Sequence, residues 1–408
     1  MGQIRTGSWE TQRGDEPRPS PRLGEYLRRL REGYGYTLRK VEEKTAALGE
    51  PIDNSQLSRF EKGKALPSFE KLRALARIFN VSVQQFSDVL DLEEYEPLKP
   101  VDAGYEEALR IGEERFARGE HGGAFAAFER AVELAVGESE SATVESAERV
   151  AEARWRLAAA LKSLGKLAMT ERELREVLKV RERIPRRARI RTLLQLSFVY
   201  RELDDLYLAE LLARESLALA TEEEDRAAQA SVLNTLGNLH EPSSPDRALA
   251  YYERSHALFE ELGAAQEEPR LVVRTNLGGC LVKTHRFEEG IAALEQAHRR
   301  AREMGFRRVA SLSLTRQAEA WLTRGRHDRA SRLLDDSDAL ASMPAGPYHD
   351  ILFLNAFHRW TAARETQHPT REKIAFGRLR HLRARIERRF PEVDAFDRHV
   401  ERSRRESR

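Results

Sequence analysis

The chain has 408 residues, of which 40% are hydrophobic and 33% are charged. This length allows about two to four domains, or one small domain followed by a repeat array. Its 69 basic and 67 acidic residues leave a net charge of only +2, so the whole chain gives no sign of polyanion binding. The single cysteine, Cys280, excludes an intramolecular disulfide framework and a cysteine-based zinc finger.

The sequence shows neither a signal peptide nor a membrane span. Its first residues lack an apolar core, and no window approaches the run of about 18 apolar residues that a bilayer requires. We therefore expect a protein of the reducing cytoplasm with no membrane partner.

Charge is distributed unevenly along the chain. Residues 21–80 carry 13 Lys and Arg against 8 Asp and Glu, and residues 371–408 carry 13 against 7. Residues 81–370 are acidic in compensation, with a net charge of −9. Local basic clusters of this kind suit phosphate contacts, because each contact releases counterions. The alternative is that they are simply solvated helix faces.

The N-terminal region divides into a tail and a small helical domain. Residues 1–20 are rich in Gly, Pro, Ser and Arg, which predicts a disordered tail. Residues 21–92 predict five short helices, and residues 93–104, with two prolines and one glycine, predict a linker. Thr37 is a candidate N-cap for the second helix, and Asp53 or Asn54 for the third.

The third of these helices separates apolar from polar side chains. Leu57 and Phe60 are three residues apart and predict a buried face, whereas the polar residues of the first turns point elsewhere. Asn and Gln suit adenine, Arg suits guanine, and Ser suits several bases. The predicted base-reading residues are Asn54, Ser55, Gln56 and Arg59, and the predicted phosphate-binding residues are Thr37, Arg39, Lys40, Lys62 and Lys64.

Residues 23–92 resemble the Cro/cI-type (Xre-family) helix-turn-helix domain. The most specific part is Leu57-Ser-Arg-Phe-Glu-Lys-Gly-Lys followed by Pro67-Ser68. This resemblance implies a five-helix, lambda-repressor-like fold that places the third helix in the major groove of double-stranded DNA. The turn at residues 46–53 is a few residues longer than is usual in the family. The alternative is a helix-turn-helix that makes only protein contacts.

Residues 105–342 repeat one helical pattern about every 40 residues. Each of the six copies has one small residue in its first half and another in its second half. Small residues at these positions let the two helices of a copy cross closely. The first small positions are Gly112, Ala158, Ser197, Gly237, Gly278 and Ala318, and the second are Ala124, Thr170, Ala209, Ala248, Gly290 and Ala330. The pattern resembles the tetratricopeptide repeat, which implies a right-handed α-solenoid with a concave groove. A generic array of α-hairpins is the alternative. Residues 343–408 predict a helical capping region with a basic tail.

The predicted inner helix faces carry polar residues that suit an effector. Asn amides donate and accept at once, which suits a peptide backbone, and Arg suits a carboxylate. The candidate groove residues are Arg156, Arg191, Gln195, Asn234, Asn238, Asn276 and Arg316, with Glu319 beside them. Two alternatives remain open: these side chains are solvated, or they hydrogen-bond between repeats.

A helix-turn-helix followed by tetratricopeptide-like repeats resembles the RRNPP group of peptide-sensing regulators. The resemblance implies an all-α, homodimeric, sequence-specific transcriptional regulator whose repeats bind a short peptide, or a protein in its place. No phosphate-binding loop, dinucleotide motif or zinc-protease motif occurs, so we expect no enzyme, metal or cofactor. Cys280 is expected to be a small packing residue. The alternative function is an interaction scaffold whose helix-turn-helix serves protein contacts or non-specific DNA tethering.

Overall fold

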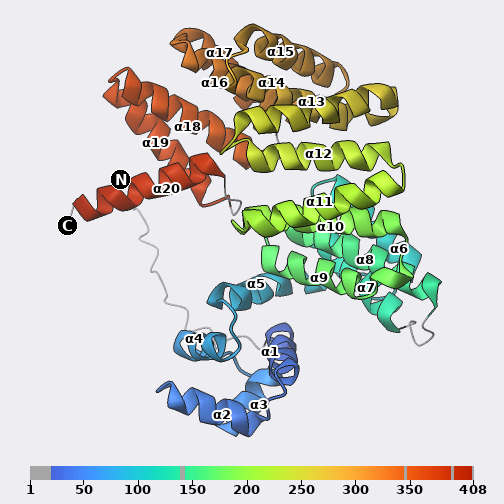
Figure 1. Ribbon diagram of the computed structural model, residues 1–408. Coiled ribbons are helices and arrows are strands. Elements are labelled where there is room, and N and C mark those ends of the chain that lie inside the picture. The colour runs from blue at the N-terminus through green and yellow to red at the C-terminus, as the bar shows by residue number, and fades with distance from the viewer. Residues whose placement is uncertain (1–19, 138–142, 344–346, 387–389, 407–408) are drawn as a thin grey trace, which may run out of the picture. The chain divides into compact units, whose positions relative to one another are not determined.

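The computed structural model describes residues 20–137, 143–343, 347–386 and 390–406, and the chain forms two compact units. The first runs from Met1 to Pro100 and the second from Val101 to Arg408. Every regular element in the described ranges is a helix (Figure 1), which confirms the all-α prediction. The tail expected at residues 1–20 lies outside the described residues, apart from Ser20.

Short capped helices build the first unit. They are α1 (Pro21–Gly33), α2 (Leu38–Ala47), α3 (Asn54–Glu61), α4 (Phe69–Ile78) and α5 (Val83–Glu93), followed by the 3-10 helix η1 (Glu96–Leu98). Each of these five α-helices is preceded by a capping residue, whose side chain accepts a hydrogen bond from a backbone N–H in the first turn of the helix. The capping residues are Ser20, Thr37, Asp53, Ser68 and Ser82. A cap of this kind stabilises a helix start by about 1 kcal/mol, so these residues determine where the short helices begin.

The first unit has one apolar core. Leu57 and Phe60 of α3 are 4% and 6% exposed, as their spacing predicts. They meet Val41 of α2 and Leu75 and Phe79 at the end of α4. The core therefore fixes the buried face of α3, and with it the direction of its polar face.

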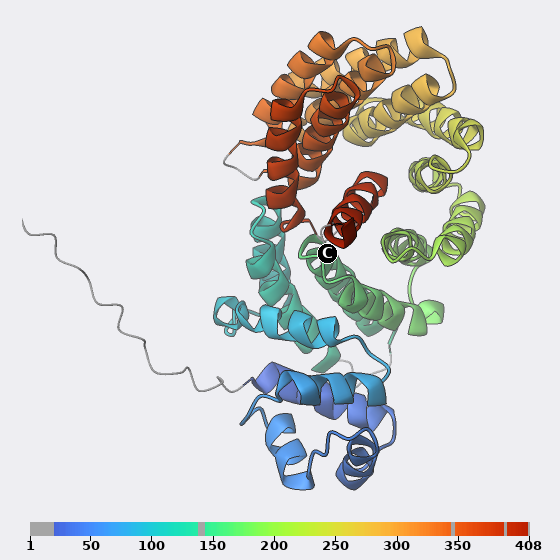
Figure 2. The ribbon, with the colours of Figure 1, turned by 90° about the vertical axis from the view of Figure 1, so that its left-hand side faces the viewer.

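Paired helices build the second unit. The pairs are α6 (Tyr105–Ala117) with α7 (His121–Gly137), α8 (Val144–Ser163) with α9 (Leu167–Lys179), α10 (Arg186–Glu202) with α11 (Leu206–Glu222), α12 (Arg226–His240) with α13 (Pro245–Leu262), α14 (Glu267–Lys283) with α15 (Phe287–Glu303), α16 (Arg307–Thr323) with α17 (His327–Ala341), and α18 (His349–Glu365) with α19 (Pro369–Arg383). Two 3-10 helices, η2 (Arg181–Arg183) and η3 (Gly263–Gln266), lie in the connections. Figure 2 shows the pairs stacked into a curved array.

The small residues lie where the two helices of a pair cross. All twelve small positions of the repeat pattern are buried. A Cβ on Gly278 would lie 2.8 Å from Leu294 and 3.0 Å from the carbonyl oxygen of Gly290. A Cβ on Gly112 would overlap the ring of Phe128, and one on Gly237 would overlap Tyr252. The period of about 40 residues therefore reflects close helix packing.

The repeat continues past the six copies expected. The helices α18 and α19 pack against each other as a further pair, and Ala356, 38 residues after Ala318, is buried like the other small positions. The predicted capping region thus begins with a seventh helical pair.

The last helix, α20 (Pro391–Glu406), turns back along the array. Val393 and Phe396 are almost fully buried, and the Phe396 ring lies 5.8 Å from that of Phe353 and 5.5 Å from that of Phe376. Arg383 at the end of α19 donates to Asp397 at 2.8 Å. Figure 2 shows α20 on the inner side of the curve. Among the described residues, no helix is both long and apolar enough to cross a bilayer.

Candidate nucleic-acid interface and effector groove

The first turns of α3 present polar side chains outward. Asp53 caps the helix by accepting from the Gln56 backbone N–H at 2.8 Å. Asn54, Ser55 and Arg59 are exposed, and Gln56 is half-buried. Asn54, Ser55 and Arg59 therefore face away from the core, whereas Gln56 lies at the edge of the core, one helical turn before Phe60.

The long turn before α3 is anchored in the core. Ile52 has no exposed surface, and its backbone N–H donates to the buried hydroxyl of Thr45 at 3.2 Å. The extra residues, which end at Asp53, therefore do not leave the start of α3 loosely held.

Contacts with α1 fix the end of α3. Gly63 follows the helix with φ +65°, the left-handed conformation that glycine tolerates best, as its place in the sequence predicts. A Cβ on Gly24 of α1 would lie 2.6 Å from the carbonyl oxygen of Phe60, so α1 packs directly on the backbone of α3. Arg31 donates to both carboxylate oxygens of Glu61, at 2.6 and 3.0 Å, and its guanidinium pKa is raised mainly by these bonds.

The polar residues of α3 differ in how far the fold already uses them. No bond from the side chains of Asn54, Ser55 or Arg59 to another described residue is found. Gln56 is different, because its Oε1 accepts a hydrogen bond from Lys71 Nζ at 2.8 Å. The predicted face thus offers hydrogen-bonding groups that have no partner in the described parts of the chain.

The predicted phosphate-binding residues are all exposed. Thr37 caps α2 by accepting from the Lys40 N–H at 3.1 Å. Arg39 and Lys40 form ion pairs with Glu43 at 3.7 and 3.1 Å, and both are more than half exposed. Such exposed pairs are worth about 0–1 kcal/mol, so they are easily broken. Lys62 and Lys64 are exposed just beyond α3.

The asparagines of the predicted groove meet across two repeats. Asn276 of α14 donates from Nδ2 to Asn234 Oδ1 of α12 at 3.0 Å and reaches Asn238 Oδ1 at 3.4 Å. Asn238 Oδ1 also lies 2.8 Å from the Tyr252 hydroxyl oxygen. Of the two alternatives to a ligand role, hydrogen bonding between repeats is therefore the one found for these three asparagines.

The other predicted groove residues are also paired within the fold. Arg156 of α8 contacts Glu113 at 2.7 Å and Glu152 at 2.8 Å, and Arg191 of α10 also contacts Glu152. Gln195 accepts from Lys162 Nζ at 2.8 Å. These side chains are therefore held in place by contacts within and between repeats.

A cavity of about 250 Å³ lies between α10, α12 and α14. Its lining combines apolar and polar side chains: Lys162, Leu194, Gln195, Phe198, Ser231, Asn234, Thr235, Phe259, Pro269, Val272 and Val273. Gln195 and Asn234 are the only predicted groove residues in it. Four further lining residues are not selected by a criterion that favours Asn, Gln and Arg: Lys162, Leu194, Phe198 and Val272. Lys162 Nζ lies 4.9 Å from the Phe198 ring centroid.

A charged cluster crosses the inner helices further along the array. Glu241, at the end of α12, is 8% exposed and accepts from Lys283 Nζ at 2.6 Å and from the Tyr252 hydroxyl at 2.8 Å. Burial alone would raise the pKa of Glu241, but the charges of Arg316 and Lys283 outweigh it and lower this pKa. Arg316 of α16 lies 4.0 Å from Glu241 and 2.9 Å from Glu319. Arg316 is thus a member of an internal ion network.

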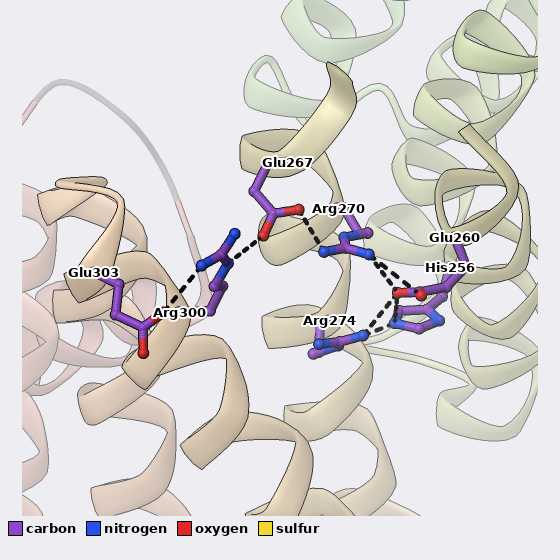
Figure 3. A network of polar contacts seen from close by, with 7 residues as sticks. All are labelled: His256, Glu260, Glu267, Arg270, Arg274, Arg300 and Glu303. Carbon is purple, nitrogen blue, oxygen red and sulfur yellow. Dashed lines mark hydrogen bonds and ion pairs between the residues drawn. The ribbon is translucent and has the colours of Figure 1, made fainter. Parts of the chain in front are cut away.

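A second network joins the outer helix α13 to α14 and α15 (Figure 3). Glu260 accepts from Arg274 at 2.7 Å, and Glu267 accepts from Arg300 at 2.8 Å. Burial and the Arg274 charge lower the pKa of His256, whose Nε2 lies 3.1 Å from Arg274 Nε. A neutral imidazole can accept that hydrogen bond. Because each charged group in Figure 3 has a partner, this network supports the stacking of repeats.

Comparison with known proteins identifies the first unit. Residues 22–88 match the family model described as a helix-turn-helix domain, so this unit is a helix-turn-helix domain. No curated protein sequence matches the chain significantly.

Solved structures show the fold of the chain as a whole. A Rap protein complexed with competence and sporulation factor is 16% identical, with 89% of this chain and 98% of that chain covered and a TM-score of 0.55. Aspartyl phosphate phosphatase F from Bacillus subtilis is 12% identical, with 95% and 97% covered and a TM-score of 0.56. The Rap conjugation gene regulator of plasmid pLS20, in complex with the Phr* peptide, is 12% identical, with 90% and 97% covered and a TM-score of 0.53.

At these identities the likeness is one of fold. Two of these structures are of Rap proteins, one complexed with competence and sporulation factor and one with the Phr* peptide, and their similarity to this chain shows a shared fold alone. The predicted architecture, a helix-turn-helix domain with a tetratricopeptide-like helical solenoid, is confirmed.

Proposed function

We propose that this protein is a sequence-specific, DNA-binding transcriptional regulator. One observation carries the proposal: Asn54, Ser55 and Arg59 project from a rigidly held helix of a helix-turn-helix domain, with no bond to another described residue. Polar side chains are costly to order unless they gain a partner, and base edges in the major groove supply donors and acceptors at this spacing.

Within this proposal the two predicted sets of residues have different roles. Asn54, Ser55, Gln56 and Arg59 read bases, and Arg59 suits a guanine. Thr37, Arg39, Lys40, Lys62 and Lys64 contact phosphates, which positions α3 without specifying sequence. The regulator acts as a homodimer in the cytoplasm on two half-sites about 34 Å apart.

The second unit is proposed to sense a short peptide. The cavity between α10, α12 and α14 offers apolar walls of Leu194, Phe198 and Val272 with Asn234 on its lining. Ligand sites commonly combine apolar walls with a few polar groups in this way. Asn234, Asn238 and Asn276 already bond to one another, so a peptide backbone has to insert into or extend this set. A protein segment could use the same groove.

We assign the regulator no catalytic site, although one structure of similar fold is of a phosphatase. The interaction-scaffold alternative has one observation in its favour. Leu206, Tyr207 and Leu211 of α11 are exposed, and Tyr207 is 81% exposed. Adjacent exposed apolar side chains favour protein contacts.

The decisive experiment selects DNA from a random library with purified full-length protein at near-physiological salt. A regulator retains an inverted repeat, and Arg59→Ala relaxes preference at one position of each half-site at a cost of about 1–3 kcal/mol. Lys62→Ala is the matched comparison, because a lost phosphate contact weakens all sequences equally and lowers the salt slope by about one. Retention without a motif, abolished by modest salt, would contradict the proposal and favour the scaffold.

A further inference from the structure

Lys71 holds the side chain of Gln56 from a neighbouring helix. It lies in the first turn of α4, where Ser68 caps the helix. Its Nζ donates to Gln56 Oε1 at 2.8 Å and lies 5.9 Å from the centroid of the Phe60 ring. Lys71 and Gln56 are both half-buried. The ammonium is thus placed by an aromatic ring on one side and an amide oxygen on the other.

This contact fixes the orientation of the Gln56 amide. An ammonium group has three donors and no acceptor, so the amide atom that it meets must be the carbonyl oxygen. The NH2 group is then on the other branch of the amide, and it has no partner among the residues that the structure describes. Gln56 therefore presents two donors, while one of the two lone pairs of its carbonyl oxygen is bonded to a positive charge that disfavours a second donor there.

The base preference of Gln56 follows from that asymmetry. A bidentate contact with adenine needs the amide oxygen to accept from N6 while the amide nitrogen donates to N7. Lys71 competes for that oxygen, and its charge opposes the positive edge of the N6 amino group. Guanine presents two acceptors, N7 and O6, which can accept from the Gln56 NH2 and also attract the ammonium.

We propose that Lys71 is a positioning residue that makes Gln56 a donor-only reader, so that Gln56 selects guanine instead of adenine. This inference rests on the proposed function, since it requires α3 to read bases. The residue type alone predicts that Gln56 binds adenine, which requires both its amide oxygen and its amide nitrogen to be available. The contact with Lys71 replaces that prediction with a preference for guanine.

Random-library selection with four full-length proteins tests the proposal: the unmodified protein, Lys71→Met, Lys71→Arg and Gln56→Ala. Gln56→Ala identifies the contacted position, because only there does base preference disappear. The unmodified protein should prefer guanine at that position. Lys71→Met keeps the apolar stem but removes the donor, and should lower the guanine-to-adenine ratio on the order of 10-fold. Lys71→Arg retains a donor and should preserve the preference for guanine.

The outcomes separate this inference from the proposed function. If a motif is recovered but Lys71→Met weakens every sequence equally, Lys71 is a phosphate contact and the inference is wrong, while the proposed function stands. An adenine preference in the unmodified protein would overturn it in the same way. If no protein recovers a motif, the proposed function fails and the inference fails with it. Lys71→Met combined with Gln56→Ala should show no further change in base preference, which checks that Lys71 acts through Gln56.

Discussion

Glu241 and Lys283 form a 2.6 Å ion pair that joins the ends of α12 and α14. The Glu241 side chain is 9% exposed and the Lys283 side chain 36%, so the pair lies at the edge of the interior. The short turn before α13 places Glu241 there, and the Tyr252 hydroxyl supplies a second hydrogen bond. The pair therefore links two consecutive repeats through a carboxylate that water scarcely reaches.

Lys283→Met should lower the free energy of unfolding by about 1–3 kcal/mol, because Glu241 loses a charged partner but stays buried. Urea unfolding monitored by circular dichroism measures the change. Lys179→Met is the matched control, since the Lys179–Glu176 pair is exposed and should contribute about 0–1 kcal/mol. Adding Glu241→Gln to Lys283→Met should recover part of the loss. Equal losses for Lys283→Met and Lys179→Met would show that burial of Glu241 does not matter.

Glu319 should make the fold sensitive to acid. Burial raises the pKa of Glu319, but the positive charge of Arg316, which also donates to it, lowers this pKa from 4.5 to about 2. A lowered folded-state pKa means that the stabilisation is complete above pH 4.5 and is lost as the pH falls towards 2.

The unmodified protein should therefore lose free energy of unfolding between pH 4.5 and 2, and Glu319→Gln should make this loss smaller by about 1–2 kcal/mol. This figure is lower than the pKa change alone implies, because a quarter of the Glu319 side chain is exposed to solvent. Urea unfolding at a series of pH values measures it. Glu261→Gln is the control, because Glu261 forms only an exposed pair with Arg226. An unchanged acid profile for Glu319→Gln would place the acid sensitivity elsewhere.

Gly24 should be intolerant of a methyl group. In Gly24→Ala the new Cβ would meet the backbone of Phe60, Glu61 and Gly63 at 2.6–2.8 Å, and backbone cannot move aside as a flexible side chain can. We expect a loss of about 1–3 kcal/mol in the unfolding of the first unit, with weaker DNA retention. Gly33→Ala, in the same helix, has open space around its Cβ and should be neutral or stabilising by up to about 1 kcal/mol. Differential scanning calorimetry of the full chain compares the two, and equal melting temperatures would mean that α1 can shift away from α3.

Much of the fold could be predicted because helix starts and buried helix faces depend on residues that are close together in the sequence. Thr37 and Asp53 cap helices through their own side chains, and Leu57 and Phe60 reveal a buried face by spacing alone. Each helix crossing needs a small residue, so the stacked helical pairs could be predicted from small residues that recur about every 40 positions. The seventh pair was missed because aromatic residues around Ala356 mask the small position.

The candidate sites were less predictable, because they depend on contacts between residues far apart in sequence. Nothing local to Gln56 indicates Lys71, which belongs to the next helix. The spacing of Asn234 and Asn276 placed them on neighbouring inner faces, but whether they bond to each other depends on side-chain rotamers. Phe198 directly follows the small position Ser197, yet an apolar residue there does not by itself distinguish a ligand wall from packing.

Cys280 should be unreactive in the folded protein. It has no exposed surface, its Sγ donates to the Pro245 carbonyl oxygen at 3.2 Å, and burial raises the pKa of its thiol to about 12. At neutral pH almost no thiolate forms, and the thiolate is the reactive species. Ellman's reagent should therefore give almost no colour with the native chain. In about 6 M guanidinium chloride it should release one equivalent, because the chain has a single cysteine. Rapid reaction at neutral pH without denaturant would show that the α12–α14 region opens far more often than its packing implies.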